Sequence, residues 1–171
     1  MIIRDAGTDD LPMILAIYND VIRTSTSVYA TEPVTLEDRR IWLEARRARG
    51  FPVLVSVNSG RVSGFASFGD WRVPNGYRYT VEHSVHVHAD LRGQGHGSRL
   101  VDALIGRAKI LQLHVMMGGI DAANGDSIRF HERLGFSKVG EIREVGRKFG
   151  RWLDLVFMQR MLEPAGTPRA D

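Results

Sequence analysis

The feature that most constrains this chain is a cluster of alternating glycines between an apolar strand and an amphipathic helix. Residues 85–100 read VHVHADLRGQGHGSRL, and apolar residues then continue with helical spacing to Ala108. Glycines let the backbone close around a ligand, and the free N–H groups and positive dipole end of a helix start attract anions. The sequence therefore predicts a phosphate or pyrophosphate cradle, with Arg99 adding charge, built from Arg92, Gly93, Gln94, Gly95, His96 and Gly97.

Two common phosphate loops do not fit this spacing. A P-loop requires Lys and then Ser or Thr after its last glycine, whereas Ser98 and Arg99 follow Gly97. A dinucleotide fingerprint starting at Gly93 would need a third glycine where Ser98 stands, and it would open the first βαβ unit, whereas this loop lies past mid-chain. An ordinary tight turn before a helix remains the plain alternative.

Hydrophobic periodicity predicts an α/β chain with a mixed sheet. Thr35 is the expected cap of a helix with an arginine-rich outer face, and Thr8, Asp9 and Asp10 are the expected cap of an earlier one. We expect strands at residues 2–4, 52–57, 61–68, 77–87, 114–120, 136–145 and 151–161, and helices at 11–22, 35–49, 100–108 and 124–134.

Length and composition narrow the class of protein. At 171 residues and 43% hydrophobic, we expect a single domain over residues 1–162 and a flexible tail, EPAGTPRAD, over 163–171. The absence of cysteine excludes disulfides, thiolate catalysis and cysteine-ligated zinc. A nucleic-acid-binding surface needs basic residues clustered on one face, whereas the net charge here is only +3 and is spread along the chain. No nucleic-acid partner is therefore expected. Because no leader pattern or membrane-length apolar run is present, we expect a cytoplasmic protein without membrane contact.

Two motifs together resemble the GNAT superfamily of acetyltransferases. Arg92, Gly95 and Gly97 match its acetyl-CoA pyrophosphate loop, Arg/Gln-x-x-Gly-x-Gly/Ala. A second signature follows at the expected distance, with His131 where tyrosine is usual: Asn124, Ser127, Phe130, Gly135 and Phe136. The resemblance implies acetyl-CoA as co-substrate and a GNAT fold, in which helices flank a central mixed, mostly antiparallel sheet with a splayed strand pair.

The resemblance narrows to the phosphinothricin and methionine sulfoximine N-acetyltransferases. It covers nearly the whole chain and includes STSVYATEP at 25–33, TVEHSV at 80–85, RFHERLGF at 129–136 and KFGRWLD at 148–154. It implies transfer of acetyl to the α-amino group of methionine sulfoximine, methionine sulfone or phosphinothricin, with a link to herbicide or antibiotic resistance, and a homodimer. Acetylation of peptide N-termini or polyamines, and a non-catalytic acyl-CoA-binding regulatory domain, are the alternatives.

The resemblance also implies roles for residues of the strand and helix around the loop. The strand glutamate of the family maps onto Glu82 as general base, which would take a proton from the acceptor ammonium. Backbone N–H groups of Val85, His86 and Val87 would meet the oxyanion and the pantetheine arm. Asn124 and Ser127 are expected cofactor contacts, and His131 inherits the proton-donor position.

The acceptor pocket is the least constrained part of the site. Arg72 and Arg78 flank a Pro-Asn-Gly turn before Glu82 and are the candidate partners of the acceptor's anionic group, with ordinary surface charges as the equal alternative. Tyr29 and Tyr79 are candidate lining residues.

Histidines on the same strand suggest a metal site only weakly. His86 and His88 would share one face with Glu82, while His83 would point the other way. A metal hydrolase is therefore geometrically conceivable, but such ligands would block the cofactor path, so no metal is expected.

Overall fold

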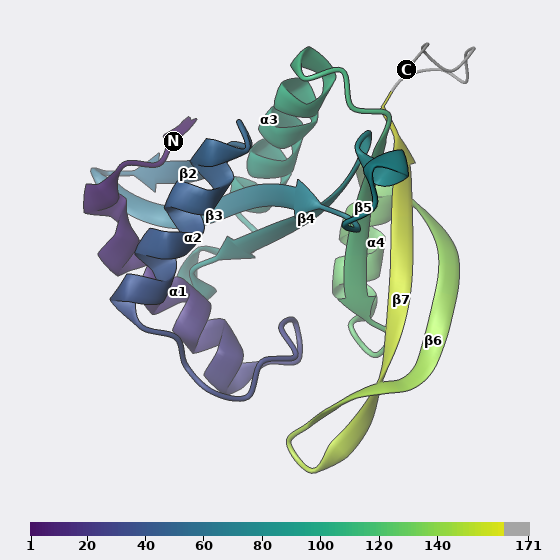
Figure 1. Cartoon of the computed structure of the whole chain (residues 1–171). Helices are drawn as coiled ribbons and strands as arrows, with labels where there is room; N and C mark the ends of the chain where they lie inside the picture. The colour runs from purple at the N-terminus through teal and green to yellow at the C-terminus, as the bar shows by residue number, and fades with distance from the viewer. Residues whose placement is uncertain (163–171) are drawn as a thin grey trace.

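The computed structural model describes residues 1–162, which form a seven-stranded sheet in the order β1-β2-β3-β4-β5-β7-β6 (Figure 1). Within the described residues, β4 and β5 are the parallel pair and the other neighbours are antiparallel. The expected mixed, mostly antiparallel sheet is thus confirmed, whereas the expected tail, 163–171, lies outside the described residues. The elements are β1 Ile2–Asp5, α1 Leu11–Thr24, α2 Leu36–Ala48, β2 Val53–Asn58, β3 Arg61–Asp70, β4 Thr80–Val87, α3 His96–Ile110, β5 Val115–Asp121, α4 Gly125–Arg133, β6 Ser137–Lys148 and β7 Arg151–Met161.

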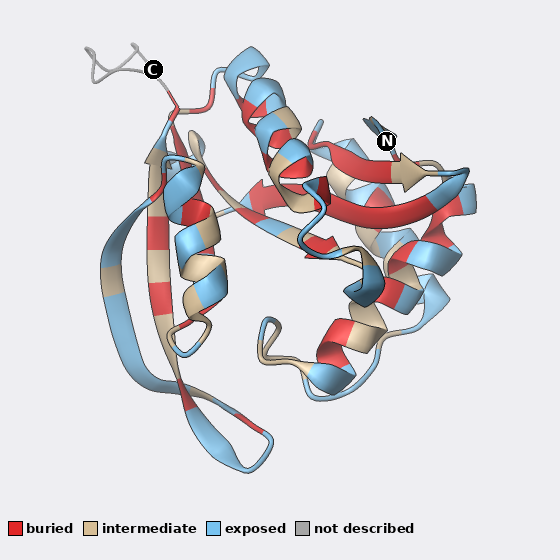
Figure 2. Ribbon diagram, turned by 180° about the vertical axis from the view of Figure 1, so that it is seen from behind, coloured by how far each residue is buried: buried red, intermediate tan, exposed pale blue. Residues whose placement is uncertain are grey.

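Helices cover both faces of the sheet. Helices α1 and α2 lie on one face over β2, β3 and β4, while α3 and α4 lie on the other (Figure 1). The sandwiched strands are buried on both sides, so the eight inner residues of β3 are all buried (Figure 2). Each face has its own apolar cluster, one around Phe65 beneath α1 and α2, and one around Leu104 and Met116 beneath α3.

The first two helices begin differently. Thr35 caps α2 as expected: its hydroxyl accepts the Asp38 N–H at 3.1 Å and Asp38 accepts the Thr35 N–H at 2.7 Å. Asp10, by contrast, makes no side-chain cap to α1 within the described chain. Its carboxylate instead accepts two bonds from Arg4, at 2.7 and 2.8 Å, and one from the Gly7 N–H at 2.7 Å. The ion pair with β1 has replaced the cap.

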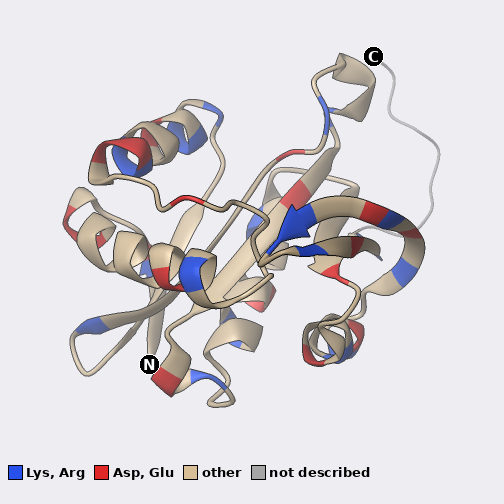
Figure 3. Ribbon diagram, turned by 90° about the horizontal axis from the view of Figure 1, so that it is seen from below, with Lys and Arg blue, Asp and Glu red and all other residues tan. Residues whose placement is uncertain are grey.

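The outer face of α2 is only partly as expected. Arg40 lies on it and bridges Glu37 and Glu44. Arg39 turns inward and is half-buried, its guanidinium 4.4 Å from the ring centroid of Tyr18 and 4.9 Å from that of Trp42. Acidic and basic residues alternate over the helices and the β6–β7 hairpin, so neither sign dominates the view in Figure 3. No described helix is long and apolar enough to cross a membrane.

Strand β4 begins three residues later than expected and separates from β5 midway. A short 3-10 turn, Asn75–Tyr77, occupies the start of the predicted strand. Pairing with β5 runs from Thr80↔Val115 to Glu82↔Met117, although β4 continues to Val87 and β5 to Asp121. At the point of divergence the His83 ring occupies the space beside Gly118, where a Cβ would stand 2.9 Å from His83 Cε1. The expected splayed pair is present.

Candidate active site

The divergence of β4 from β5 opens a cleft of about 750 Å³, which is lined from the side of α3 and α4 and reaches Val21 of α1 and Ser27 through the gap. Its walls come from the free half of β4, the glycine loop, the end of β5 and α4. Among the predicted site residues the lining includes Val85, His86, Val87, Arg92, Gly93, Gly95, His96, Gly97, Asn124, Ser127 and His131.

The glycine loop is shaped to hold an anion. Gly93 and Gly95 have φ values of +74° and +83°, in the left-handed region that favours glycine. Gly95 precedes α3, and no described side chain caps the helix there, so the N–H groups of the first turn face the cleft. A Cβ added at Gly93 or Gly95 would meet no described atom within 4 Å, so the loop borders open space. These residues fit the diphosphate of a nucleotide cofactor.

Two side chains of the loop are turned back onto the protein. Arg92 Nε donates to Val87 O at 3.3 Å, which places its guanidinium at the junction of loop and strand. Gln94 Nε2 donates to Asp90 O at 3.2 Å and does not line the cleft in the described structure. Gln94 therefore stabilises the turn that precedes α3.

His96 has an anchoring contact that the sequence did not reveal. Its buried ring places Nδ1 2.9 Å from Ser63 Oγ and 3.3 Å from Ser56 Oγ. The Ser63 hydroxyl donates to Ser56 O at 3.0 Å, so His96 Nδ1 is the donor toward Ser63. This network ties the first turn of α3 to β2 and β3.

The backbone N–H groups of β4 point alternately to β3 and away from it. His88 N donates to Ser63 O at 2.9 Å and Trp71 N donates to Thr80 O at 3.3 Å. Because antiparallel pairing alternates, the even-numbered residues of β4 exchange hydrogen bonds with β3, including His86 opposite Phe65. The N–H groups of Val85 and Val87 therefore point into the gap, whereas the N–H of His86 points to β3. The His86 ring packs against Phe65 and Tyr18 at centroid distances of 5.2 and 5.6 Å.

Glu82 does not line the cleft in the described structure, and its side chain points to the face covered by α1 and α2, at the point where β4 and β5 part. Its Oε1 stands 3.1 Å from where a Cβ of Gly119 would be, and Gly119 itself lines the cleft. Burial raises the pKa of the Glu82 carboxyl, and the positive charge of Arg72 partly opposes that rise. A carboxylate with a raised pKa at the end of a gap through the sheet can accept a proton near neutral pH.

His131 projects from α4 to the cleft and meets His83 from β4. The two Nε2 atoms are 3.1 Å apart. His131 Nδ1 is 2.7 Å from Ser127 O, and His83 Nδ1 is 2.8 Å from Met117 O. Desolvation lowers the pKa of both rings, that of His83 to about 4. Asn124 caps α4, its Oδ1 accepting the Ser127 N–H at 3.1 Å.

The four predicted acceptor residues do not line this cleft in the described structure, and they lie in three places. Arg72 is near enough to Glu82 to lower its pKa, and its guanidinium lies 5.3 Å from the Trp71 ring centroid. Arg78 instead stacks over Tyr79 at 4.6 Å, beside the start of β5, where Tyr79 O accepts the N–H of Val115 at 3.1 Å. Among the predicted acceptor residues, Arg72 is thus the one whose positive charge lies near Glu82.

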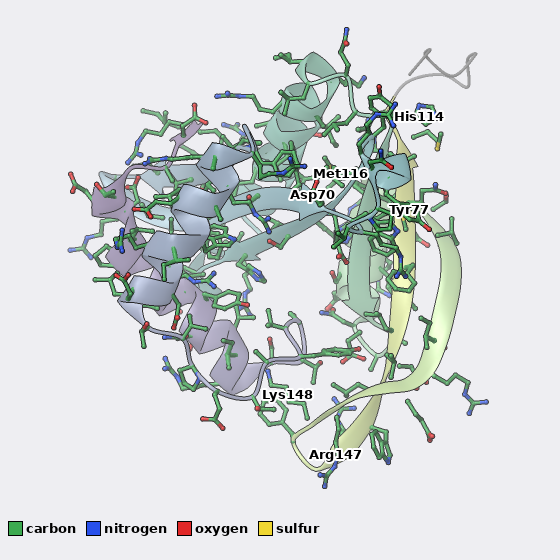
Figure 4. The ribbon with its side chains drawn as sticks, viewed as in Figure 1. Asp70, Tyr77, His114, Met116, Arg147 and Lys148 are labelled. Carbon is green, nitrogen blue, oxygen red and sulfur yellow. The ribbon has the colours of Figure 1, made fainter. Side chains whose placement is uncertain are left out.

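Tyr29 belongs to a loop held across the end of β5. Its hydroxyl donates to Asp154 O at 2.9 Å, and burial together with nearby carboxylates raises its pKa to about 12. In the same loop Thr26 hydrogen-bonds Asp121. Lys148 of β6 donates to Ser25 O at 2.8 Å and Val28 O at 2.6 Å, whereas Arg147 lies near the tip of the hairpin (Figure 4). These long-range contacts left no local signal in the sequence.

Comparisons with known proteins agree with this geometry. A model of the Acetyltransferase (GNAT) family matches residues 14–136. The chain belongs to the GNAT acetyltransferase family. This GNAT enzyme is therefore an N-acetyltransferase, and its sheet, split beside a glycine loop, is the fold of that family.

Relatives of this GNAT enzyme match it over nearly their whole length. It is 52% identical over 163 residues, 95% of both chains, to the L-methionine sulfoximine/L-methionine sulfone acetyltransferase of Pseudomonas aeruginosa. The structure of a Salmonella typhimurium acetyltransferase with its cofactor acetyl-CoA is 46% identical, covers 100% of this chain and 99% of its own, and has a TM-score of 0.96. A phosphinothricin acetyltransferase of Sinorhizobium meliloti in complex with acetyl-CoA is 32% identical, with coverage of 99% and 92% and a TM-score of 0.95.

Within residues 1–162, no group of three or more histidine, cysteine, aspartate or glutamate side chains is arranged to hold a metal ion. His83 and His86 project to opposite faces of the sheet, as the strand alternation predicts.

Proposed function

We propose that this GNAT enzyme transfers acetyl from acetyl-CoA to the α-amino group of small amino acids of the methionine sulfoximine, methionine sulfone and phosphinothricin type. The observation that carries the proposal is the gap through the sheet. One face of the gap has the glycine loop and the other has a half-buried carboxylate with a raised pKa. The acceptors named for the Pseudomonas and Sinorhizobium relatives give the substrate class.

Acetyl-CoA, a substrate here, would lie along the cleft. The N–H groups around Gly95 and the positive end of α3 would bind its diphosphate, with Arg92, Gly93, His96 and Gly97 shaping the loop. The N–H groups of Val85 and Val87 would bind the pantetheine arm and the oxyanion that develops on the thioester. Asn124 and Ser127 would hold the start of α4 against the same arm.

Glu82 would act as the general base. An amine attacks a thioester only in its neutral form, so a carboxylate must first take a proton from the acceptor ammonium, directly or through water. Desolvation raises the pKa of Glu82 and so brings it closer to the pH at which the enzyme works. His131, which lines the cleft on the CoA side, would return a proton to the departing thiolate.

Arg72 would bind the anionic group of the acceptor. It is the predicted cation whose charge reaches Glu82, and it is held over Trp71, which in turn packs on Phe157 at a centroid distance of 5.3 Å. Tyr29 would close the far side of the pocket from the loop over Asp121. Arg78 and Tyr79 would contribute from the pocket entrance as a stacked pair.

We also propose a cytoplasmic homodimer with a role in resistance to such amino-acid analogues. The β6–β7 hairpin supports the assembly, because its edge carries exposed apolar side chains, among them Trp152 at 61% exposure, with Val139, Ile142, Val145 and Phe149. A second copy would cover this edge.

The decisive experiment is a thiol-release assay with acetyl-CoA and a panel of acceptors. We expect release with methionine sulfoximine, methionine sulfone or phosphinothricin, and much slower release with polyamines and peptide N-termini. Preference for either of the latter would overturn the proposed acceptor class. Binding of acetyl-CoA without release for any acceptor would indicate a non-catalytic acyl-CoA-binding domain.

A further inference from the structure

We infer that His83 and His131 hold one proton between their Nε2 atoms, and that this shared proton is the one given to the CoA thiolate. The inference rests on the proposed acetyl transfer and adds to it a second histidine, from the strand next to Glu82. Its basis is the set of three contacts that the four ring nitrogens make: each Nδ1 with a backbone carbonyl, and the two Nε2 atoms with each other.

The carbonyl contacts fix which ring nitrogens carry hydrogen. A carbonyl oxygen can only accept, so His131 Nδ1, 2.7 Å from Ser127 O, must be an N–H. His83 Nδ1, 2.8 Å from Met117 O, must be an N–H for the same reason. Each ring in its neutral form has a single N–H, so both Nε2 atoms then carry lone pairs.

Those lone pairs face each other at 3.1 Å, a normal distance for an N–H···N hydrogen bond but a repulsive one for two acceptors. A third proton placed between the Nε2 atoms satisfies all four nitrogens and leaves the pair with one positive charge. The geometry of the pair is therefore that of two imidazoles sharing a proton, with His83 as the positioning partner of His131.

Both rings are shielded, His83 at 6% and His131 at 5% exposure, yet both line the cleft. Phe136 packs against both rings, at centroid distances of 5.1 and 5.4 Å, so neither can rotate freely away from the other. Gly118 leaves the space that His83 occupies, since a Cβ there would stand 2.9 Å from Cε1 of that ring. The contact between His83 and His131 therefore forms part of the cleft wall beside which the thioester sulfur would lie.

The proton transfer balances without another reagent. When the C–S bond of the tetrahedral adduct breaks, its electron pair leaves with sulfur as a thiolate. The shared proton moves from Nε2 to sulfur, which yields the CoA thiol and a neutral histidine pair. The nitrogen gives its second proton to water as the amide forms, and Glu82 returns to water the proton that it took from the ammonium. The pair regains one proton from water after CoA leaves, so each turnover releases one proton.

Charged groups around the pair can shift its titration. His86 follows on the same strand, and burial lowers its pKa to about 4. Burial also lowers the pKa of His83 and of His131, and the contact between their two Nε2 atoms, which favours the protonated pair, opposes that fall. Glu82 precedes His83 but points to the other face of the sheet. The remaining titratable side chains that share the cleft walls are Arg92, His96, Asp121, Asp126, Arg129 and Arg133. Their charges act equally on variants that differ only at position 83.

Two substitutions separate the two contacts of His83. In His83→Asn the amide nitrogen can replace Nδ1 toward Met117 O, but nothing replaces Nε2. In His83→Gln the amide can reach the position of Nε2, where it donates to a neutral His131 or accepts from a protonated one, but it has no titrating proton of its own to share. His114→Gln is the matched control, because His114 lies just before β5, far from the hairpin tip (Figure 4), and does not line the cleft in the described structure.

Nitrogen-15 NMR of the six histidines in the full-length protein counts the protons directly. Between about pH 5 and pH 9 we expect both Nδ1 atoms to stay protonated and the two Nε2 signals to titrate in one common step. In His83→Gln the Nε2 of His131 should titrate alone, because the amide carries no titrating proton. Independent titration of the two rings, or a neutral ring without Nδ1–H, would overturn the shared proton.

Kinetics test whether that proton is used. The alkaline limb of the kcat profile should move to lower pH by about one to two units in His83→Asn, because a charged hydrogen bond of ordinary strength is lost. In His83→Gln the amide oxygen can still accept from a protonated His131, so the limb should move less than in His83→Asn, with the KM for acetyl-CoA changed less than about twofold. A uniform loss in both variants without a moved limb would reduce His83 to a packing residue. Failure of every acceptor in the wild type would instead contradict the proposed function, with the NMR result unaffected.

Discussion

Glu82 and His83 are neighbours in β4, and their side chains point to opposite faces of the sheet. Glu82 lies beside Gly119 on the face covered by α1 and α2, whereas His83 meets His131 on the face covered by α3 and α4. The alternation of a strand thus supplies a carboxylate to one side of the gap and an imidazole pair to the other. Two substrates can therefore approach a common point from opposite sides.

Replacing the carboxylate tests its role as base. We expect Glu82→Gln to lower kcat/KM for the acceptor by about 10²- to 10⁴-fold, the usual contribution of general base catalysis, while the fold is kept. Glu37→Gln is the matched control, since Glu37 is exposed on α2 and pairs with Arg40, and its rate should be unchanged. Steady-state kinetics with circular dichroism decide the matter, and a Glu82→Gln rate near wild type would sink the assignment.

The pH dependence should report the raised pKa of Glu82. The base must be ionised, so kcat/KM should rise as pH rises through this pKa, above the range of an ordinary glutamate. Because Arg72 lowers that pKa, Arg72→Gln should move the acid limb to higher pH as well as raise the KM for the acceptor. A limb that stays in place or moves to lower pH in Arg72→Gln would contradict the pairing.

Two glycines with similar backbones separate strain from ligand binding. Gly95 and Gly60 have φ values of +83° and +78°, so an alanine at either should cost about 1 to 2 kcal/mol of unfolding free energy. Gly95 lines the cleft, whereas Gly60 lies in the β2–β3 turn. We therefore expect Gly95→Ala alone to raise the KM for acetyl-CoA, by about tenfold or more. Equal KM values in the two variants would argue against a diphosphate at this loop.

A methyl group at Gly119 should displace the base without removing it. The added Cβ would stand 3.1 Å from Glu82 Oε1 and 3.4 Å from Leu155 Cδ1. A displaced carboxylate loses alignment, so kcat should fall by about tenfold to a hundredfold in Gly119→Ala. Gly106→Ala on α3, where no described atom lies within 4 Å, should leave kcat unchanged and stabilise the helix by about 0.5 to 1 kcal/mol. Matching kcat values for the two variants would show that Glu82 tolerates the shift.

Local signals in the sequence predicted the elements and the loop well. Glycine spacing and helical periodicity indicated the cradle before α3, and Thr35 with Asp38 indicated the start of α2. The predicted start of β4 was wrong. Aromatic residues near Tyr77 are typical of strands, but here they follow a turn and form a 3-10 segment. The prediction that Asp10 helps to cap α1 was wrong, because Arg4 on the preceding strand binds its carboxylate.

Contacts between distant residues could not be read from spacing. His131 lies 48 residues from His83, and His96 lies 33 residues from Ser63. Each pair forms only after the sheet and helices have packed, and each ring looks in the sequence like an ordinary polar residue. The same limit applies to Arg72 and Arg78, whose similar positions around one turn gave no reason to favour Arg72, the one that reaches Glu82.

A crystal structure with CoA and methionine sulfone tests the central claim, that two substrates meet through the gap between β4 and β5. The account predicts the diphosphate on the N–H groups around Gly95, the sulfur beside the His83–His131 pair, and the acceptor amine hydrogen-bonded to Glu82 directly or through one water. A diphosphate bound away from the loop, or both ligands on the same face of the sheet, would contradict it.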